Sequence, residues 1–232
     1  MVLKTKHSEI IFGDSCWGSL NSYVKTNAYS SVFLLTDTNT KLKCLPLANT
    51  KIEFDFNTLE MQAGEENKHI LSCVSLWNSL SEKGADRKSL LINIGGGVVT
   101  DLGGFVACTF KRGIDFINVP TSLLAMVDAS VGGKTGIDLG ALKNQVGIIR
   151  EPKMVLVDTN FLDTLPDSEY RSGYAEMLKH GLIKEPAYFE TLSVFLNKEE
   201  ILPHIYNSVS LKAQVVSEDM EEHGLRKILN YG

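Results

Sequence analysis

The sequence predicts an α/β fold, in which an N-terminal domain with a mostly parallel sheet is followed by the start of an all-helical C-terminal domain. Short β-branched and apolar runs alternate with helical patterns as far as Pro166, and no convincing strand follows that residue. Alternating strand and helix patterns are typical of parallel sheets built from βαβ units. We therefore expect an α/β domain over residues 1–166 and the first part of a helical domain over residues 167–232.

The strands are predicted from apolar runs that end in polar, proline or glycine residues. A helical apolar pattern over 69–80 separates the first two of them and completes a βαβ unit. Because ligands of open α/β sheets bind beyond the carboxyl ends of the strands, we expect the residues just after these runs to face a ligand. The predicted strands lie at 31–39, 90–97, 115–119 and 153–157.

Composition excludes several classes of protein. The 232 residues carry 28 acidic and 23 basic side chains, a net charge of -5, which argues against a dedicated nucleic-acid binder. No apolar run approaches the roughly 20 residues of a membrane span, and no signal peptide follows Met1, so we expect a cytoplasmic protein without membrane contact. The four cysteines have no paired spacing and are expected in the core.

Glycine and charge are concentrated between Leu90 and Gly147, which suggests that an anion lies against this backbone. Gly95–Gly97 follow a strand and open a helix, so backbone N–H groups and the helix dipole would face a phosphate, although the run is not G-x-G-x-x-G and could be a plain tight turn. Asp101 could accept a hydrogen bond from a ribose or nicotinamide, or only balance the helix N-terminus.

The segment Gly132–Thr135 (GGKT) superficially matches a Walker A loop. That motif needs glycine where Asp128 stands, and no strand leads into it, so we reject an ATPase. Lys134, together with Lys143 and Asn144, could instead form an anion pocket of ammonium and amide groups, or a solvated basic loop.

Two polar clusters follow in the helical part. Glu176, Lys179 and His180 can share one helix face; Glu-x-x-x-His could be half of a metal site, but is more often a surface hydrogen bond, and the spacing alone assigns no metal. A second set has helical spacing, for which a solvated face is the usual explanation: Lys212, Asp219, Glu222, Arg226 and Asn230.

Several long motifs in this order resemble the 3-dehydroquinate synthase family, from about Asp37 to the last residue. The most specific are GGGVVTDLGGF, KRGIDFINVPTSLLAMVDASVGGKTGID, LKNQVGIIREPKMVLVDTNFLDTLP, GYAEMLKHGLIK and GLRKILNYG. The resemblance implies an NAD-binding α/β domain and a helical domain with Zn²⁺ (or Co²⁺) in the cleft. It implies conversion of 3-deoxy-D-arabino-heptulosonate 7-phosphate, a sugar phosphate carrying a carboxylate, to 3-dehydroquinate and phosphate in the shikimate pathway.

Carried over motif by motif, the resemblance assigns site residues. Positions that resemble NAD contacts are Asp37, Asn39, Glu65, Lys68, Gly97, Val98, Asp101, Thr121, Ser122, Asp128, Lys143, Phe161, Thr164 and Leu165. Positions that resemble substrate contacts are Asp128, Lys134, Asn144, Lys179, Lys212, Arg226 and Asn230, with Glu222 as a cleft acid. Glu176 resembles the metal-ligand glutamate, and Arg112 resembles an arginine that reaches the phosphate of a neighbouring subunit, which implies a homodimer.

The resemblance also contains departures. Its two histidine metal ligands would follow the closing LNYG, where this sequence ends, so we expect a truncated chain that is inactive alone. Ser122 stands where the family usually has a second threonine, and Ala129 where it often has serine. Open alternatives are another sugar-phosphate cyclase, of the 2-deoxy-scyllo-inosose or 2-epi-5-epi-valiolone synthase type, a metal-dependent polyol dehydrogenase, or a noncatalytic NAD-binding fragment.

Overall fold

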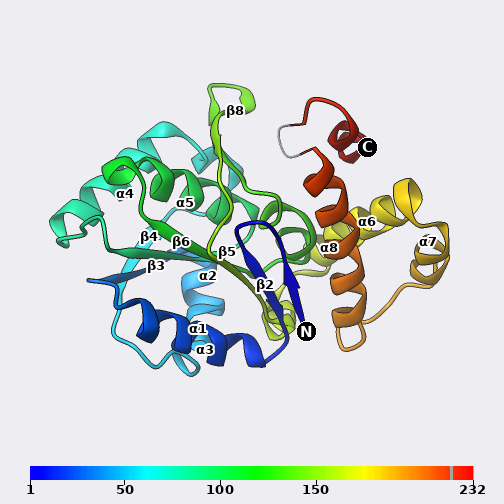
Figure 1. The fold of residues 1–232 in the computed structure, drawn as a ribbon, viewed down its shortest axis with the longest axis horizontal. Coiled ribbons are helices and arrows are strands. Elements are labelled where there is room, and N and C mark those ends of the chain that lie inside the picture. Colours follow the sequence, from blue (N-terminus) through cyan, green and yellow to red (C-terminus); the bar gives the residue numbers. More distant parts are fainter. Residues whose placement is uncertain (220–221, 232) are drawn as a thin grey trace.

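The computed structural model describes residues 1–219 and 222–231, and its central feature is a seven-stranded sheet in the order β1-β2-β9-β6-β5-β3-β4. Every neighbouring pair in it is parallel except β1 and β2. Helices cover both faces, and a helical segment lies beside the sheet (Figure 1). The predicted fold class, a mostly parallel α/β unit followed by helices, is confirmed.

All four predicted strands and the helix between the first two are present. The strands are β1 (Val2–Lys4), β2 (Glu9–Phe12), β3 (Val32–Asp37), β4 (Asn57–Met61), β5 (Leu90–Gly95), β6 (Asp115–Pro120), β7 (Lys134–Leu139), β8 (Leu142–Ile149) and β9 (Met154–Val157). The α-helices are α1 (Ser15–Asn27), α2 (Thr38–Lys43), α3 (Leu45–Asn49), α4 (Ile70–Glu82), α5 (Gly97–Thr109), α6 (Asp167–Lys184), α7 (Pro186–Leu192) and α8 (Ile201–Glu218). Shorter turns are η1 (Glu65–Asn67), η2 (Phe110–Arg112), the π-helical turn η3 (Ala125–Ala129), η4 (Thr159–Thr164) and η5 (Leu225–Asn230).

Strands that the sequence analysis did not predict lie mostly at edges. β4 is an edge strand, and β7 and β8 form a separate antiparallel hairpin that projects from the body (Figure 1). Every residue of β8 is exposed, so its sequence lacks the apolar run that marks a buried strand.

Alternating side chains of the strands divide the core between the two faces of the sheet. Leu34 and Ile92 point into a cluster that also holds α1, α3 and residues of α6 to α8. Leu35 and Leu91, one position along each strand, point into the cluster formed with α4 and α5. The helical segment is therefore continuous with the first core, where Phe12 of β2 packs edge-on against Tyr206 of α8 at 5.2 Å between ring centroids.

The four cysteines are buried and free, as predicted for small core residues. Among the helices of the described residues, none is long and apolar enough to cross a bilayer.

Close packing accounts for part of the glycine concentration. A Cβ on Gly103 would lie 2.1 Å from Oδ1 of buried Asn93, and one on Gly104 would lie 2.5 Å from Cγ2 of Thr135. These two glycines let α5 approach the sheet and β7. They have a structural role, so packing rather than an anion accounts for Gly103 and Gly104.

We predict that Gly103→Ala destabilises the protein by about 1–3 kcal/mol, because the added methyl group overpacks the contact with Asn93. Gly18→Ala is the matched control: that glycine is also helical, but a Cβ there would meet no atom within 4 Å. The control should gain up to about 1 kcal/mol from helix propensity. Urea unfolding of the three proteins measures both effects, and equal stability of Gly103→Ala and wild type would contradict the packing argument.

Candidate active site

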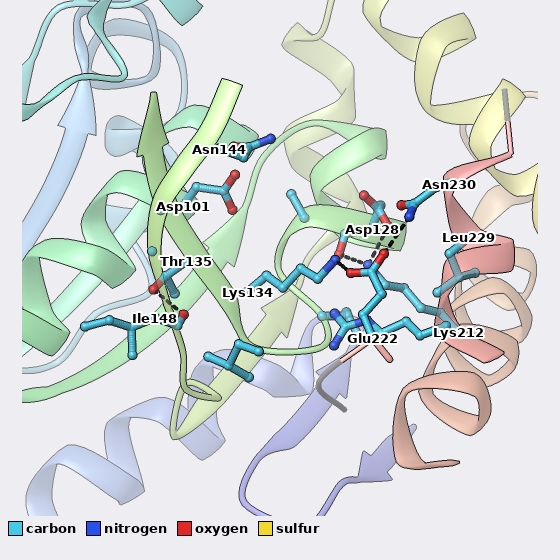
Figure 2. A pocket seen from close by; sticks show the side chains of 16 residues that line it. Asp101, Asp128, Lys134, Thr135, Asn144, Ile148, Lys212, Glu222, Leu229 and Asn230 are labelled. Carbon is cyan, nitrogen blue, oxygen red and sulfur yellow. Dashed lines mark hydrogen bonds and ion pairs between the residues drawn. The ribbon is translucent and has the colours of Figure 1, made fainter. Parts of the chain in front are cut away.

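A cavity of about 570 Å³ lies between the carboxyl-terminal side of the sheet, the β7–β8 hairpin and the segment around η5 (Figure 2). Its walls are polar at the centre, and Thr135, Ile148, Ile149 and Leu229 add apolar surface. Eight residues that the sequence analysis assigned to the site line this one cavity: Asp101, Asp128, Lys134, Asn144, Lys212, Glu222, Arg226 and Asn230.

Lys134 bridges the two sides of the cavity. It extends from the start of β7 and forms an ion pair with Glu222, which precedes η5 (Figure 2). Oε1 of Glu222 also accepts a hydrogen bond from Nδ2 of Asn230 at 2.6 Å. Burial, reinforced by the positive charges of Arg226 and Lys212, lowers the pKa of Lys134. Lys134 therefore lies near two other cations, Lys212 and Arg226, an arrangement expected of a site that binds anions.

Asp128 and buried Lys212 form an ion pair that joins the α/β part to the helical part. Asp128 lies on η3, and Lys212 on α8 donates to both its backbone oxygen, at 2.6 Å, and its carboxylate. Although burial opposes ionisation, the charge and hydrogen bond of Lys212 hold the pKa of Asp128 below its usual range. Lys212 is only 5% exposed and Arg226 only 3%. The solvated-face interpretation is therefore wrong for these two residues.

Arg226 holds the glycine loop in front of β7. Its Nη2 donates to the carbonyl oxygen of Gly132 at 3.1 Å. Gly132 has a φ of 95°, which favours glycine. The GGKT segment is thus a loop that enters β7 at Lys134. A π-helical turn precedes it where a Walker A loop would follow a strand, so the rejection of that motif is confirmed.

Lys68 connects the start of α5 with the hairpin. Its ammonium group donates to Oδ2 of Asp101 at 2.6 Å and to Oδ1 of Asn144 at 2.7 Å, and the residue is 4% exposed. Asn144 has a φ of 54°, and its N–H donates to Oδ1 of Asp138 at 2.7 Å. Asp138 is a residue that the sequence analysis missed, although an aspartate near the turn of a polar hairpin is a recognisable backbone-capping signal.

The other residues assigned to a cofactor gather where the parallel strands end. Asp37 ends β3 and caps α2, because its Oδ1 accepts from the N–H groups of Asn39 at 2.9 Å and Thr40 at 2.7 Å. Lys143 on β8 lies 3.3 Å from Glu65 of η1. The remaining members follow β5, β6 and β9 in the chain: Gly97, Val98, Thr121, Ser122, Phe161, Thr164 and Leu165.

Asp158 fixes the last of these segments. It is buried directly after β9, and its Oδ2 accepts from the indole N–H of Trp17 at 2.7 Å. Its Oδ1 accepts a hydrogen bond from the N–H of Asn160 at 3.1 Å, so Asp158 caps the start of η4. A satisfied buried carboxylate therefore sets the path of η4, on which Phe161 and Thr164 lie.

Glu176 and His180 lie one turn apart on α6, and together with Asp128 they present one ligand atom each within 4.8 Å of one another. Both helix residues are largely buried, so the expectation of a surface hydrogen bond is wrong: α8 and η3 cover this face of α6. Among the described residues, Oε1 of Glu176 and Nε2 of His180 have no partner in hydrogen-bond geometry. A carboxylate is a ligand suited to Zn²⁺ or Co²⁺, so Glu176, with Asp128 nearby, fits such a cation.

The charge around Glu176 is balanced by Lys179. Nζ of Lys179 lies 2.7 Å from Oε1 of Glu176 and also donates to the backbone oxygen of Leu229 at 2.7 Å. Burial opposes ionisation of Glu176, but contacts with His180 and Lys179 hold its pKa below the usual range. Glu176 is therefore held as an ionised acceptor.

Arg112 does not line this cavity. It lies on η2, has a φ of 72°, and lines a separate hollow with Asp86, Arg87, Lys88 and Lys111. Its assignment to the phosphate of a neighbouring subunit remains a prediction.

Solved structures with this architecture define the class of protein first. A 2-deoxy-scyllo-inosose synthase complexed with carbaglucose-6-phosphate, NAD⁺ and Co²⁺ matches with a TM-score of 0.88 at 25% identity, over 100% of this chain and 68% of that one. A 2-epi-5-epi-valiolone synthase from Streptomyces hygroscopicus, with NAD⁺ and Zn²⁺ bound, matches with a TM-score of 0.84 at 24% identity, over 100% and 67%. The fold is that of the sugar-phosphate cyclases.

Sequence comparison identifies the family within that class. Residues 58–172 match the N-terminal and residues 173–232 the C-terminal family of 3-dehydroquinate synthase, and the chain belongs to the 3-dehydroquinate synthase family. The 3-dehydroquinate synthase of Parabacteroides distasonis is 45% identical over 218 residues, 92% of this chain and 62% of the relative. That of Prochlorococcus marinus strain SARG is 48% identical over 191 residues, 77% and 51%. The chain thus spans only part of these relatives.

We predict that Asp101 makes stability depend on pH. Burial raises the pKa of Asp101 from 3.8 to about 6, against the opposing charge of Lys68. The folded state therefore holds this proton to a higher pH than the unfolded chain, so the contribution of Asp101 to stability falls as pH rises from about 4 to about 6. Relative to Asp101→Asn, the wild type should lose up to about 3 kcal/mol across this window, at about 1.4 kcal/mol per pKa unit.

Urea unfolding at several pH values measures this difference. Asp163→Asn, which changes an exposed aspartate, is the control for the loss of one negative charge. Wild type and Asp101→Asn with parallel pH profiles would contradict the raised pKa.

Proposed function

We propose that the full-length protein carrying this chain is a 3-dehydroquinate synthase, a carbon–oxygen lyase that converts 3-deoxy-D-arabino-heptulosonate 7-phosphate to 3-dehydroquinate and phosphate. The observation that carries the proposal is the cavity that brings Lys134, Lys212 and Arg226 together beside the carboxyl ends of the strands. A substrate with one carboxylate and one phosphate needs several fixed cations, and family membership supports this reaction class.

NAD is proposed to bind at the carboxyl ends of β3, β5 and β6. When bound, NAD would supply reversible hydride transfer to and from a substrate alcohol, chemistry that would acidify a neighbouring C–H group and so favour loss of phosphate. The N-terminus of α5, opened by Gly96 and Gly97, offers backbone N–H groups and a positive dipole end to a phosphate. Asp101, held by Lys68, is positioned to accept a hydrogen bond from the cofactor.

A divalent cation, Zn²⁺ or Co²⁺, is proposed to bind at Glu176, where it would polarise substrate oxygen atoms as a Lewis acid. Asp128 lies within the same ligand group, but Lys212 already engages its carboxylate. A catalytic zinc ordinarily has three protein ligands and an open position. We therefore propose that further ligands lie outside this chain and that the chain alone is inactive.

The cations of the cavity are proposed to exchange their present acidic partners for substrate anions. Lys134 is half-exposed and paired with Glu222, so an incoming anion can replace that carboxylate at modest desolvation cost. Lys212 is buried against Asp128 and is suited to a fixed contact. Asn144 and Asn230 add amide donors at the same wall.

Assembly and location extend the proposal. Arg112 and its basic neighbours lie apart from the cavity, which is compatible with contact to the site of a second subunit in a cytoplasmic homodimer. The enzymatic alternative is another sugar-phosphate cyclase, and the likeness to 2-deoxy-scyllo-inosose synthase is the specific observation that favours it.

The full-length protein is expected to release phosphate from the heptulosonate phosphate in the presence of NAD and Zn²⁺, without net NADH. Phosphate release and absorbance at the NADH band are followed together, with glucose 6-phosphate as the competing substrate. Turnover of glucose 6-phosphate without heptulosonate turnover would refute the synthase. Accumulating NADH would instead indicate a polyol dehydrogenase.

Lys134→Met should raise the KM of the full-length enzyme for the heptulosonate phosphate by about 10- to 100-fold, because a charge-assisted hydrogen bond contributes about 1.5–3 kcal/mol. NAD affinity should stay within about twofold, since Lys134 faces the substrate side; this limit is about 0.4 kcal/mol. Lys153→Met is the control, because Lys153 lies near Asp115 and does not line the cavity. An unchanged KM in Lys134→Met would contradict the assigned role.

The chain itself is expected to bind NAD without turning over substrate. Asn39→Ala should weaken NAD binding measured by calorimetry, because exposed Asn39 lies in the first turn of α2, directly after β3. Asn49→Ala, at the exposed end of α3, is the matched control. No NAD binding by the unmodified chain would contradict the cofactor site within these residues.

A further inference from the structure

His180 is the most deeply buried ionisable side chain near the cavity, at 1% exposed, and the sequence resemblance gives it no role. It lies on α6 between two polar groups. Nδ1 is 2.8 Å from Oγ of Ser208 on α8, and Nε2 is 3.2 Å from Oε1 of Glu176 one helical turn earlier. Ser208 is fully buried. The three side chains form a buried row that runs from α8 through the imidazole to the carboxylate.

The protonation of the ring follows from its surroundings. A bare Nε2 lone pair facing a carboxylate oxygen would leave two buried acceptors opposed, which is costly without a donor between them. A proton on Nε2 removes that conflict. With the ring proton on Nε2, Nδ1 can accept the hydroxyl hydrogen of Ser208. The atoms are within hydrogen-bond distance at 3.2 Å, although the ring N–H is not aligned with Oε1 in this structure.

The row determines which oxygen of Glu176 is available. Nζ of Lys179 lies 2.7 Å from Oε1, the same oxygen that His180 approaches. Because the Lys179 ammonium group and the His180 ring both lie beside Oε1, we take Oε2 as the oxygen left to a cation. Groups that hold a ligating carboxylate in this way commonly alter metal affinity by about 10- to 100-fold.

We propose that His180 is a positioning residue for the metal site, in which its Nε2–H group holds Oε1 of Glu176 while Ser208 fixes the ring. The role rests on the proposed function, because it requires a cation at Glu176. His180 is not itself a ligand in this arrangement. It acts by limiting the rotation of the carboxylate.

The test is a titration of Co²⁺ into the metal-free full-length protein, followed by visible absorption. His180→Phe removes the donor with little change in volume, and Ser208→Ala releases the ring; each should weaken Co²⁺ binding by about 10- to 100-fold. His180→Gln retains an N–H group at a similar distance from α6 and should stay within about threefold of the wild type, a difference of about 0.7 kcal/mol. Ser210→Ala, on α8 like Ser208, is the matched control for Ser208→Ala and should bind Co²⁺ as the wild type does.

A second measurement separates positioning from packing and from direct ligation. Nitrogen chemical shifts of the metal-free protein should show the His180 proton on Nε2, and each variant should remain folded by circular dichroism at the temperature of the titration. Undiminished Co²⁺ binding by folded His180→Phe would overturn the positioning role. Two other results would overturn it by indicating a direct ligand: a ring proton on Nδ1 instead of Nε2, or a Co²⁺ affinity of His180→Gln as low as that of His180→Phe. A wild type that binds no Co²⁺ would refute the metal site itself, whereas the other outcomes leave the proposed function intact.

Discussion

The ion pair between Asp128 and buried Lys212 is the contact on which the geometry of the site depends. Asp128 lies on the π-helical turn that follows β6, and Lys212 lies on α8, so the pair joins the sheet to the helical segment across 84 residues of sequence. Because Lys212 is buried, removal of Asp128 would leave an uncompensated buried charge, at a cost of up to about 3–5 kcal/mol. Its neighbours Glu176 and Arg226 are placed by the same junction, because they lie on elements that pack around η3 and α8.

Charge balance is the second constraint. Burial, together with the nearby charges of Arg226 and Lys212, lowers the pKa of Lys134 in the cavity, and acids there partly neutralise the three cations. On the side proposed for the cofactor, the charge of Lys68 is balanced by Asp101, and its ammonium group also donates to Asn144. An anionic ligand at this surface would compete with carboxylates that already occupy the cations, so its affinity would be a difference between two sets of contacts rather than a sum.

The glycine-rich run from Leu90 to Gly147 has more than one cause. Gly96 and Gly97 start α5 and leave its N-terminal N–H groups accessible from the strand ends. Gly103 and Gly104 permit close packing of that helix, and Gly132 provides a left-handed turn before Lys134. Composition suggested one anion-binding surface because glycines needed for packing and glycines needed for a ligand look alike in a sequence.

The sequence by itself determined the central strands, the helices that connect them and, through its long motifs, the family. It also placed the residues that we assign to a cofactor at the strand ends. These features depend on local periodicity and on residues close together in the chain. Only the tertiary structure decided that Lys212 and Arg226 are buried, that His180 lies between Ser208 and Glu176, and that the exposed strand β8 forms a wall of the cavity. The physical reason is that burial and pairing depend on which elements pack together, and helical spacing is the same for a solvated face as for one covered by a neighbouring helix.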